Sequence, residues 1–457
     1  MNDEYDGFIA RKAQYDERLG DVVGIEDMPD FLFPFQRQLV SWSIEMGRSA
    51  IFADCGLGKT AMQLAWANHF VRSTNKSALI LTPLSVGAQT VREANKFGID
   101  AVRSRGGEMP SGATIVVANY EQLHKFSSVD FCSVVCDESS CIKDFKSKRK
   151  DAVVEFLRLI PFRLLCTATA APNDYWELGT SSEALGLLGF RDMITTFFKQ
   201  ETSKDHLGWG RTKYRFRGHA EEPFWNWVCS WARSMRRPSD LGFSDDGYIL
   251  PKLIEREFVV DCEKTRPGML FSMPGKTLNE QRAERRNSIS ERCDKAAEIA
   301  NGVDGPVVCW CELNDESKRL TEVVDGAKQV TGSMQDEEKE EILTAFSTGQ
   351  IDRLVTKPKI GAWGLNWQHC SDIVSFPSHS YEQYYQSIRR CYRFGQESEV
   401  NATTIVNEGE CGILDSLKRK ASQAETMFSS IVNHMHNALH LMSMDTFDQK
   451  EELPEWL

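Results

Sequence analysis

The octapeptide Ala53-Asp54-Cys55-Gly56-Leu57-Gly58-Lys59-Thr60 follows a short apolar run and opens a helical pattern. A strand, a glycine-rich turn and a helix in this order are the context of a phosphate-binding loop. The two glycines allow a tight turn that points backbone N–H groups at phosphate, and the helix N-terminus adds partial positive charge. Lys59 would then reach the outer phosphates of a nucleotide, and Thr60 would bind Mg²⁺. The strict pattern begins with Gly where this chain has Ala, so a strand–helix turn without ligand is the alternative.

Apolar runs of strand length recur on both sides of this loop. In the first half of the chain they lie at 50–53, 78–81, 114–117, 133–136 and 163–166, and in the second half at 306–310, 353–355, 373–376 and 402–406. Helical patterns separate them, such as those at 62–71 and 335–346. Short buried strands that alternate with helices are typical of α/β domains built around a parallel sheet. The predicted fold is therefore α/β, with two tandem parallel-sheet lobes.

The two sets of runs also divide the chain. We expect an N-terminal lead-in at 1–30, a first lobe at 31–200, an inter-lobe insertion at 201–284, a second lobe at 285–425 and a C-terminal tail at 426–457. The insertion is rich in Trp, Arg, Pro and Gly and fits neither lobe. The tail ends in an acidic stretch, which we expect to be partly flexible.

Composition excludes several classes of protein. No apolar run approaches the roughly 18 residues of a membrane span, and the polar N-terminus lacks the apolar core of a secretory signal. The 13 cysteines are scattered, which indicates reduced thiols in a cytoplasmic protein and no paired zinc pattern. The net charge of −12 argues against a protein that coats nucleic acid through bulk positive charge. Binding to nucleic acid would need local basic clusters.

A pair of carboxylates ends the apolar run at 133–136. Alone, an Asp-Glu pair after a strand is typical of a solvated turn. Downstream of a phosphate loop it indicates a nucleotide hydrolase, because hydrolysis needs one carboxylate to hold Mg²⁺ and another to orient or deprotonate water. Asp137 suits the first role and Glu138 the second.

The segment Asp137-Glu138-Ser139-Ser140-Cys141-Ile142-Lys143 resembles motif II of the Swi/Snf-type branch of superfamily-two helicases. Ser140 stands where that branch has His. In that branch the His usually makes the contact that couples motif II to its neighbours. The resemblance implies two RecA-like lobes, ATP and Mg²⁺ as cofactors, and nucleic acid as the partner. A weaker likeness of 238–251 to phage-encoded helicases of this branch implies the cytoplasm of a bacterial host.

Four further segments resemble motifs of the same family. Residues 33–36 are similar to the adenine-side segment, in which Gln36 would read the base edge. Residues 81–84 resemble motif Ia, which contacts the nucleic-acid backbone. Residues 166–169 resemble motif III, which couples the ATP site to the track, that is, the nucleic acid along which such a protein moves. Residues 359–367 resemble motif V, where glycines such as Gly364 would permit close approach to phosphate or sugar.

The segment at 386–396 resembles motif VI, with the spacing Gln-x₃-Arg-x₂-Arg-x-Gly-Gln. The resemblance places Gln386, Arg390 and Arg393 at the catalytic site. Hydrolysis puts charge on the γ-phosphoryl oxygens, and a guanidinium supplied from across a cleft stabilises it. The two arginines are three residues apart and share a helix face. The alternative is a solvated basic helix end favoured by the helix dipole.

Two basic clusters are candidates for the track. Residues 211–217 place a basic residue at every second position, so a strand would show cations on one face and Tyr214 and Phe216 on the other. Its partner would be phosphate, or the charges would only protect a solvated edge strand. For the second cluster, at 143–150, a solvated helix start is the favoured interpretation of the individual lysines.

The leading hypothesis is an ATP-hydrolysing DNA translocase or helicase. The details of motifs II and VI favour double-stranded DNA. One alternative is an RNA helicase. The other is a nucleic-acid-binding protein that ATP switches between two conformations with little turnover.

Overall fold

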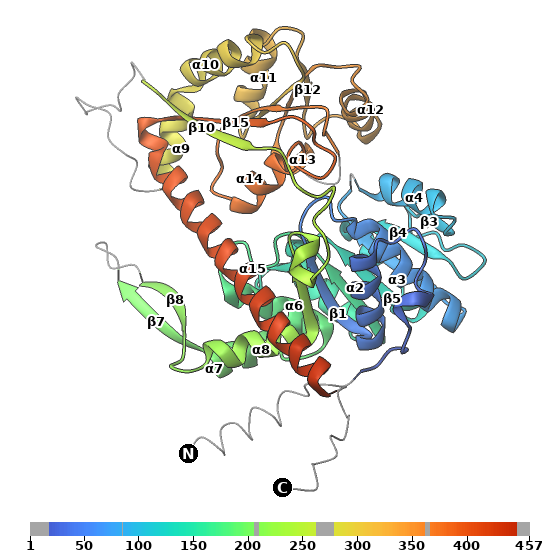
Figure 1. Cartoon of the computed structure of the whole chain (residues 1–457). Helices are drawn as coiled ribbons and strands as arrows, with labels where there is room; N and C mark the ends of the chain where they lie inside the picture. Colours follow the sequence, from blue (N-terminus) through green and yellow to red (C-terminus); the bar gives the residue numbers. More distant parts are fainter. Residues whose placement is uncertain (1–17, 85, 205–209, 262–277, 362–365, 446–457) are drawn as a thin grey trace, which may run out of the picture.

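A computed structural model describes residues 18–84, 86–204, 210–261, 278–361 and 366–445. These residues form two α/β lobes and a long C-terminal helix that lies along both (Figure 1). None of the described helices combines the length and apolar character needed to cross a membrane.

The first lobe is built on a seven-stranded sheet in the order β3-β4-β2-β5-β6-β1-β9, with every neighbouring pair parallel. Its strands are β1 (Arg48–Ala53), β2 (Ser77–Thr82), β3 (Ala101–Arg103), β4 (Ile115–Asn119), β5 (Phe131–Asp137), β6 (Phe162–Cys166) and β9 (Ala232–Met235). The strands β2 and β5 are buried along their whole length, and β1 is buried after its first residue, as expected of a parallel sheet covered on both faces.

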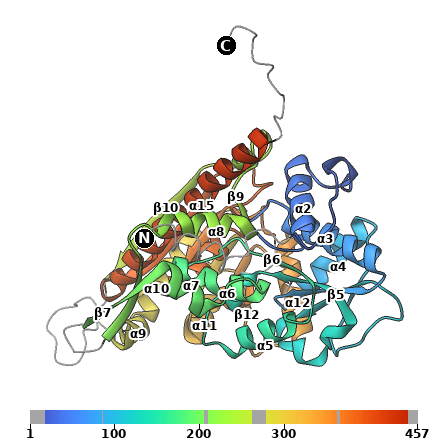
Figure 2. The same cartoon turned by 90° about the horizontal axis from the view of Figure 1, so that it is seen from below.

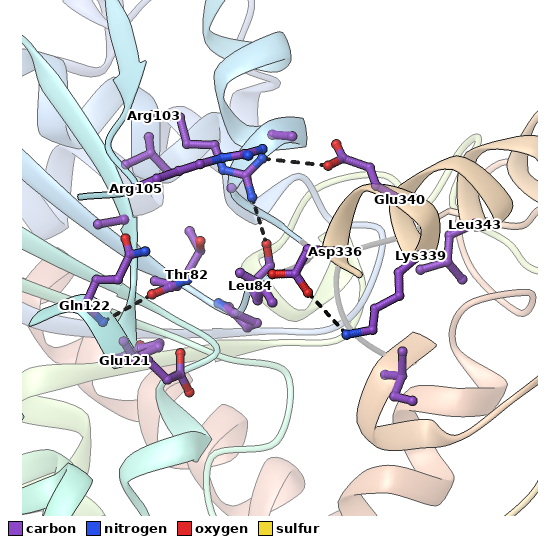
Figure 3. A pocket seen from close by; sticks show the side chains of 18 of the residues that line it. Thr82, Leu84, Arg103, Arg105, Glu121, Gln122, Asp336, Lys339, Glu340 and Leu343 are labelled. Carbon is purple, nitrogen blue, oxygen red and sulfur yellow. Dashed lines mark hydrogen bonds and ion pairs between the residues drawn. The ribbon is translucent and has the colours of Figure 1, made fainter. Parts of the chain in front are cut away.

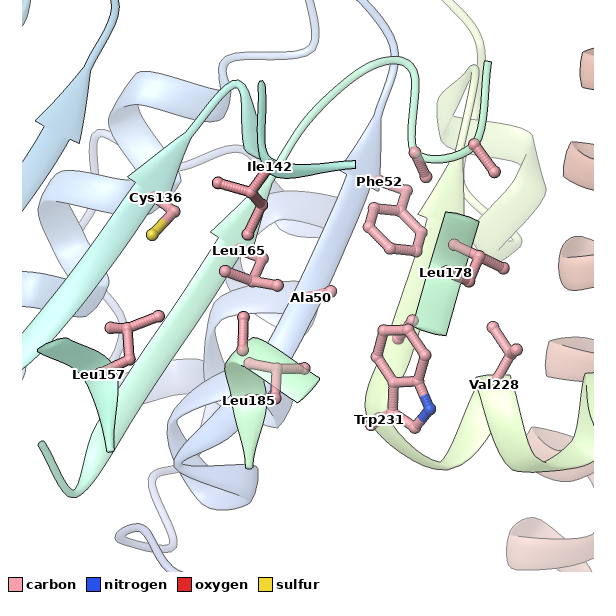
Figure 4. Close-up of a cluster of buried hydrophobic side chains, with 14 of the residues drawn as sticks. Ala50, Phe52, Cys136, Ile142, Leu157, Leu165, Leu178, Leu185, Val228 and Trp231 are labelled. Carbon is pink, nitrogen blue, oxygen red and sulfur yellow. The ribbon is translucent and has the colours of Figure 1, made fainter. Parts of the chain in front are cut away.

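Helices cover the two faces of this sheet. They are α2 (Pro34–Met46), α3 (Lys59–Thr74), α4 (Gly87–Lys96), α5 (Lys148–Leu157), α6 (Leu178–Leu185), α7 (Phe190–Phe197) and α8 (Glu221–Trp231). Alternate residues of β1 serve opposite cores, since Phe52 packs with Trp231 of α8 (Figure 4) and Ile51 with Leu39 of α2. β1 is therefore held rigidly from both sides, and its carboxyl end carries the phosphate loop.

The second lobe has a six-stranded parallel sheet in the order β10-β15-β14-β11-β13-β12. Its strands are β10 (Leu253–Val260), β11 (Val307–Trp310), β12 (Lys328–Val330), β13 (Arg353–Thr356), β14 (Asp372–Ser375) and β15 (Val400–Asn407). Its helices are α9 (Leu278–Asn287), α10 (Ile289–Asn301), α11 (Asn314–Val323), α12 (Asp336–Ser347), α13 (Pro358–Gly361) and α14 (Tyr381–Ile388). The prediction of two tandem parallel-sheet lobes is confirmed.

The range expected as an inter-lobe insertion contributes to both sheets. β9 pairs with β1 at the edge of the first sheet, and β10 pairs with β15 at the edge of the second. β9 is only four residues long, and β10 carries three consecutive exposed charged residues, Glu255, Arg256 and Glu257. Neither segment therefore shows an uninterrupted apolar run of strand length. Between α7 and α8, this range also forms the antiparallel hairpin of β7 (Phe198–Lys204) and β8 (Gly210–Phe216).

The helix α15 (Cys411–Asp445) joins the lobes. Its first turns pack in the second lobe, where Ile413 and Leu417 contact Tyr381. Further along, Phe428 and Ile431 are buried in the core of the first lobe beside α8 (Figure 2). The chain at 426–445 is thus a helix, and through residue 435 it packs as core. The acidic end of the expected tail lies outside the described residues.

Candidate active site between the lobes

The phosphate loop connects β1 to α3, as its sequence predicts. Gly56 and Gly58 have φ values of 89° and 75°, in the left-handed region that favours glycine. α3 begins at Lys59, so the free N–H groups of its first turn face the loop. The Lys59 ammonium donates to the carbonyl oxygens of Ala53 and Asp54, at 2.9 and 3.2 Å. The loop therefore already gathers the backbone and the cation that phosphate needs.

Gln36 at the start of α2 holds this loop through a side-chain hydrogen bond. Its Nε2 donates to the carbonyl oxygen of Leu57 at 2.9 Å, and its Oε1 accepts from the backbone N–H of Phe33. A Cβ at position 58 would lie 2.3 Å from the same Nε2, which is a second reason for glycine there. The structure thus gives Gln36 a role in shaping the loop. Its expected role in reading a base edge stays a prediction.

The two predicted carboxylates lie buried at the carboxyl end of β5. Asp137 accepts a 2.6 Å hydrogen bond from Gln63, one turn into α3. Glu138 has a positive φ of 49°, which is strained for a residue with a side chain. Its Oε2 accepts from Thr167 Oγ1 at 3.2 Å. Motif II is therefore tied to the phosphate helix on one side and to motif III on the other.

Charges from both lobes act on these carboxylates. Burial raises the pKa of Asp137 and raises the pKa of Glu138 to about 7, while Lys59 and Arg390 lower both pKa values. Lys59 belongs to the first lobe and Arg390 to the second. A cation from each lobe therefore stands near the same pair of acids, as charge stabilisation on a transferred phosphoryl group requires.

Replacing Glu138 with Gln is expected to stabilise the protein at pH 8 in EDTA without nucleotide. Because burial holds the folded-state pKa near 7, the folded protein binds a proton that the unfolded chain releases near pH 4.5. The stability that Glu138 contributes is therefore lost as pH rises from about 4.5 to about 7. We expect the melting temperature of the variant to exceed that of the unsubstituted protein by at least about 2 °C at pH 8.

The same melting curves at pH 5 provide the comparison, since the difference should shrink there. Glu222→Gln, which changes an exposed carboxylate of α8, is the matched control and should show no such trend. A melting difference that stays constant between pH 5 and pH 8 would contradict the buried, proton-binding state of Glu138.

The second lobe brings the predicted residues of motif VI to the loop. Gln386 Oε1 accepts from Arg390 Nη2 at 2.9 Å and lies 3.7 Å from Cys55 Sγ in the phosphate loop. Arg390 is buried. Arg393 is half-buried, and burial together with the charge of Arg390 lowers its pKa to about 10. Gln386 and the two arginines therefore line the lobe interface beside the loop.

Two contacts at this interface were not anticipated. Arg389 forms an ion pair with Asp54, and Lys143 forms one with Glu382 of α14. The sequence contained a signal for the first, since Asp54 and Arg389 are opposite charges inside two motifs expected to face each other. By its place in the sequence, Asp54 is expected only as a phosphate-loop residue. Its side chain in fact points to the second lobe.

The donor set at Thr60 and Asp137 fits Mg²⁺. Thr60 lies in the first turn of α3, and the Gln63–Asp137 hydrogen bond brings that turn against the carboxylate. In nucleotide sites Mg²⁺ uses one or two carboxylates together with phosphates and water. The described residues contain no group of three His, Cys, Asp or Glu side chains suited to a metal. Gly364 lies outside the described residues.

Ser140 stands where the branch that this segment resembles has His. Its hydroxyl is buried and has no hydrogen-bond partner among the residues that the structure describes. The contact between motifs II and III is made instead by Thr167 and Glu138. The Cβ-to-Oγ reach of Ser140 is too short to replace a His ring, so coupling through this position is absent from the described contacts.

A cavity of about 1070 Å³ opens between the lobes (Figure 3). Its walls include the motif Ia residues 82–84, Lys359 of motif V and Glu138, so it adjoins the carboxylates. Arg103 and Arg105 line it on the first lobe and lie 4.0 and 3.6 Å from Glu340 and Glu337 of α12. Both arginine–glutamate pairs are partly exposed, so another anion can compete for the arginines.

The two basic clusters predicted as nucleic-acid contacts lie in different environments in the structure. In the hairpin, Tyr214 and Phe216 pack against the first core, and Arg215 pairs with Glu201 at 3.1 Å. The side chains of Arg211 and Lys213 lie outside the described residues. In the cluster at 143–150, Lys150 is buried and bonded to Glu183. Arg149 also has an acidic partner. This cluster is therefore largely structural, and the hairpin stays a predicted contact.

Comparison with known proteins agrees with this geometry. Residues 292–395 match the family model described as the helicase conserved C-terminal domain. A search of curated protein sequences finds no match. Among solved structures, S. cerevisiae Dbp5 bound to RNA and ADP BeF3 is 13% identical with a TM-score of 0.53, over 88% of this chain and 98% of that one. A variant of Dbp5 gives the same values.

A third structure is more distant. The Sulfolobus solfataricus SWI2/SNF2 ATPase core in complex with dsDNA is 16% identical, over 90% of this chain and 96% of that one, with a TM-score of 0.40. The fold is that of two tandem RecA-like lobes. The residues that match the helicase C-terminal family model all lie in the second lobe.

Proposed function

We propose that the protein is an ATP-dependent translocase or helicase that hydrolyses ATP between its lobes and moves along double-stranded DNA. The observation that carries the proposal is the placement of Lys59 and Arg390, from opposite lobes, around Asp137 and Glu138. A site divided in this way is complete only when the lobes are closed, so the chemistry can be coupled to their movement.

The residues suggest a division of labour for hydrolysis. The phosphate loop and Lys59 bind the phosphates, Glu138 orients or deprotonates the attacking water, and Arg390 stabilises charge on the transferred group. Mg²⁺, held by Thr60 and Asp137, would neutralise charge on the β- and γ-phosphate oxygens. Arg393, half-buried beside Arg390, is the second cation of that lobe. The raised pKa of Glu138 suits a base that works near neutral pH.

The cavity beside Glu138 is the proposed track. Arg103 and Arg105 on one wall and Lys359 on the other offer cations to a phosphate backbone. The choice of DNA rests on the resemblance of motifs II and VI to the Swi/Snf-type branch. An RNA helicase is the second candidate, since the fold overlaps that of Dbp5, whose structure contains RNA. A switch with little turnover is disfavoured by the presence of Glu138 and both arginines.

ATP hydrolysis measured with double-stranded DNA, single-stranded DNA and RNA decides between these candidates. Stimulation by duplex DNA supports the proposal, whereas stimulation by RNA alone supports the second candidate. A rate near zero with every nucleic acid indicates the switch. Strand-displacement and triplex-displacement assays on the best activator then separate unwinding from translocation.

Replacing Arg103 and Arg105 together with Ala is expected to weaken binding of the activating nucleic acid. Each lost phosphate contact should reduce the slope of log affinity against log salt by about 0.9, so the double variant should lose about 2 from the slope. Binding is followed by fluorescence anisotropy between 50 and 200 mM salt. Arg319→Ala, which removes a partly exposed arginine of α11 that pairs with Asp294 and does not line the cavity, is the control. An unchanged slope would remove the cavity as the track.

A further inference from the structure

We propose that Arg389 and Asp54 form a latch that fixes the phosphate loop against motif VI and holds the lobes closed before nucleotide binds. The latch is distinct from the arginine pair at 390 and 393. Its effect on nucleotide use rests on the proposed function, whereas its effect on lobe closure does not.

The carboxylate of Asp54 is surrounded by donors from both lobes. From its own loop, it accepts a 2.6 Å hydrogen bond from the backbone N–H of Cys55. From the second lobe, Tyr385 donates its hydroxyl to Oδ1, Arg389 Nε lies 3.3 Å from Oδ1, and Arg389 Nη2 pairs with Oδ2. The Asp54 side chain is 8% exposed and that of Arg389 is 11% exposed. The contact is therefore shielded from salt and water.

Arg389 is itself fixed by its surroundings. Its Nη1 donates to the carbonyl oxygen of Tyr392 at 3.1 Å, and its guanidinium lies 5.6 and 5.4 Å from the rings of Tyr385 and Tyr392. Burial by itself would lower the pKa of Arg389, but the Asp54 carboxylate and Tyr385 reverse this and raise it. Since Nε, Nη1 and Nη2 all have acceptors, Arg389 acts as a positioning residue for the loop.

The adjacent residues Arg389 and Arg390 therefore have different roles. Arg390 bonds to Gln386 and acts on the motif II carboxylates, whereas Arg389 bonds to the phosphate loop itself. Breaking the Asp54–Arg389 pair would leave a buried charge without its partner, which is costly in the closed state alone. In the open state both groups would meet water. Either single substitution should thus shift the lobes toward the open state.

This shift predicts a particular kinetic signature. If ATP binds the closed form, its apparent affinity falls in proportion to the fraction of molecules that are closed. A drop of the closed fraction to about a tenth raises KM for ATP about tenfold, while kcat at saturating ATP should change less than about threefold. A residue that touched the transferred phosphoryl group would instead lower kcat.

The test uses the full chain with Asp54→Asn, Arg389→Gln, the double variant, and Arg319→Gln as a matched control, which removes a partly exposed ion pair between α10 and α11 of the same lobe. Small-angle X-ray scattering without nucleotide measures closure. Both single variants should be more extended than the unsubstituted protein, and the control should not. In ATPase assays the double variant should be no worse than the poorer single one, a coupling of about tenfold, or about 1.4 kcal/mol.

Unchanged scattering together with additive KM effects would overturn the proposal. So would a fall in kcat without a rise in KM for Arg389→Gln, since that would make Arg389 a phosphate contact. If the unsubstituted protein hydrolyses no ATP, the proposed function fails and scattering alone still decides on the latch. Should Arg389→Gln fail to fold, Tyr385→Phe removes a single hydroxyl and should open the lobes to a smaller extent.

Discussion

Replacing Lys59 with Ala should reduce the rate of ATP hydrolysis by at least about 10²-fold, as expected when a preorganised group that stabilises charge is removed. Lys59 is held above the loop by the carbonyl oxygens of residues 53 and 54, and its charge also acts on both buried carboxylates. Alanine would remove the cation that faces the outer phosphates and would leave two acids with less compensation.

The rate is measured with saturating ATP and the best activating nucleic acid. Lys76→Ala, an exposed lysine just beyond the other end of α3, is the control for loss of one positive charge. Thermal unfolding confirms that both variants are folded. Hydrolysis at the unsubstituted rate would show that the loop at 53–60 is not the site of hydrolysis.

Replacing Arg390 with Ala should lower kcat by about 10³–10⁵-fold, the range for removal of an arginine supplied across a cleft. Arg390 is buried at the interface and acts on Asp137 and Glu138 from the second lobe. ATP binding, which the first lobe largely provides, should persist. The substitution should thus separate binding from chemistry.

Single-turnover hydrolysis measures the chemical step, and equilibrium titration with a fluorescent nucleotide measures binding. Arg390→Lys keeps the charge but loses the planar fork, so it should recover only part of the rate. Weaker binding with kcat unchanged would place Arg390 in the nucleotide pocket without a role in the transition state. A rate within a few-fold of the unsubstituted protein would contradict the two-lobed site.

The parts of the site that sequence predicts are those in which chemistry fixes residue type and spacing together. Phosphate requires glycine, lysine and a helix start in one order, and the loop at 53–60 follows it. The acid pair at 137–138 and the arginines at 390 and 393 obey the same constraint. The fold follows from buried runs at 133–136 and 373–376, which parallel strands covered on both faces must have.

The remaining features depend on contacts between distant segments. β9 and β10 are sheet edges, and one is too short and the other too charged to show a buried pattern. The buried face of α15 is visible only beside α8. The pairing of Asp54 with Arg389 needs the two lobes in a defined register, which no local pattern specifies. Each of these features is decided by packing between segments that are distant in the sequence, because the local sequence is compatible with more than one arrangement.

The helix α15 restricts how the two lobes can move relative to each other, because it packs against both. Ile413 is anchored in one lobe and Met435 in the other, roughly 33 Å apart at the helical rise of 1.5 Å per residue. The second-lobe contacts run along the helix to Ala424, and the first-lobe contacts begin at Met427, about 4.5 Å further on at that rise. The joint between the lobes is therefore a single turn of one continuous helix, and a movement that separates the lobes must bend or unpack the helix there.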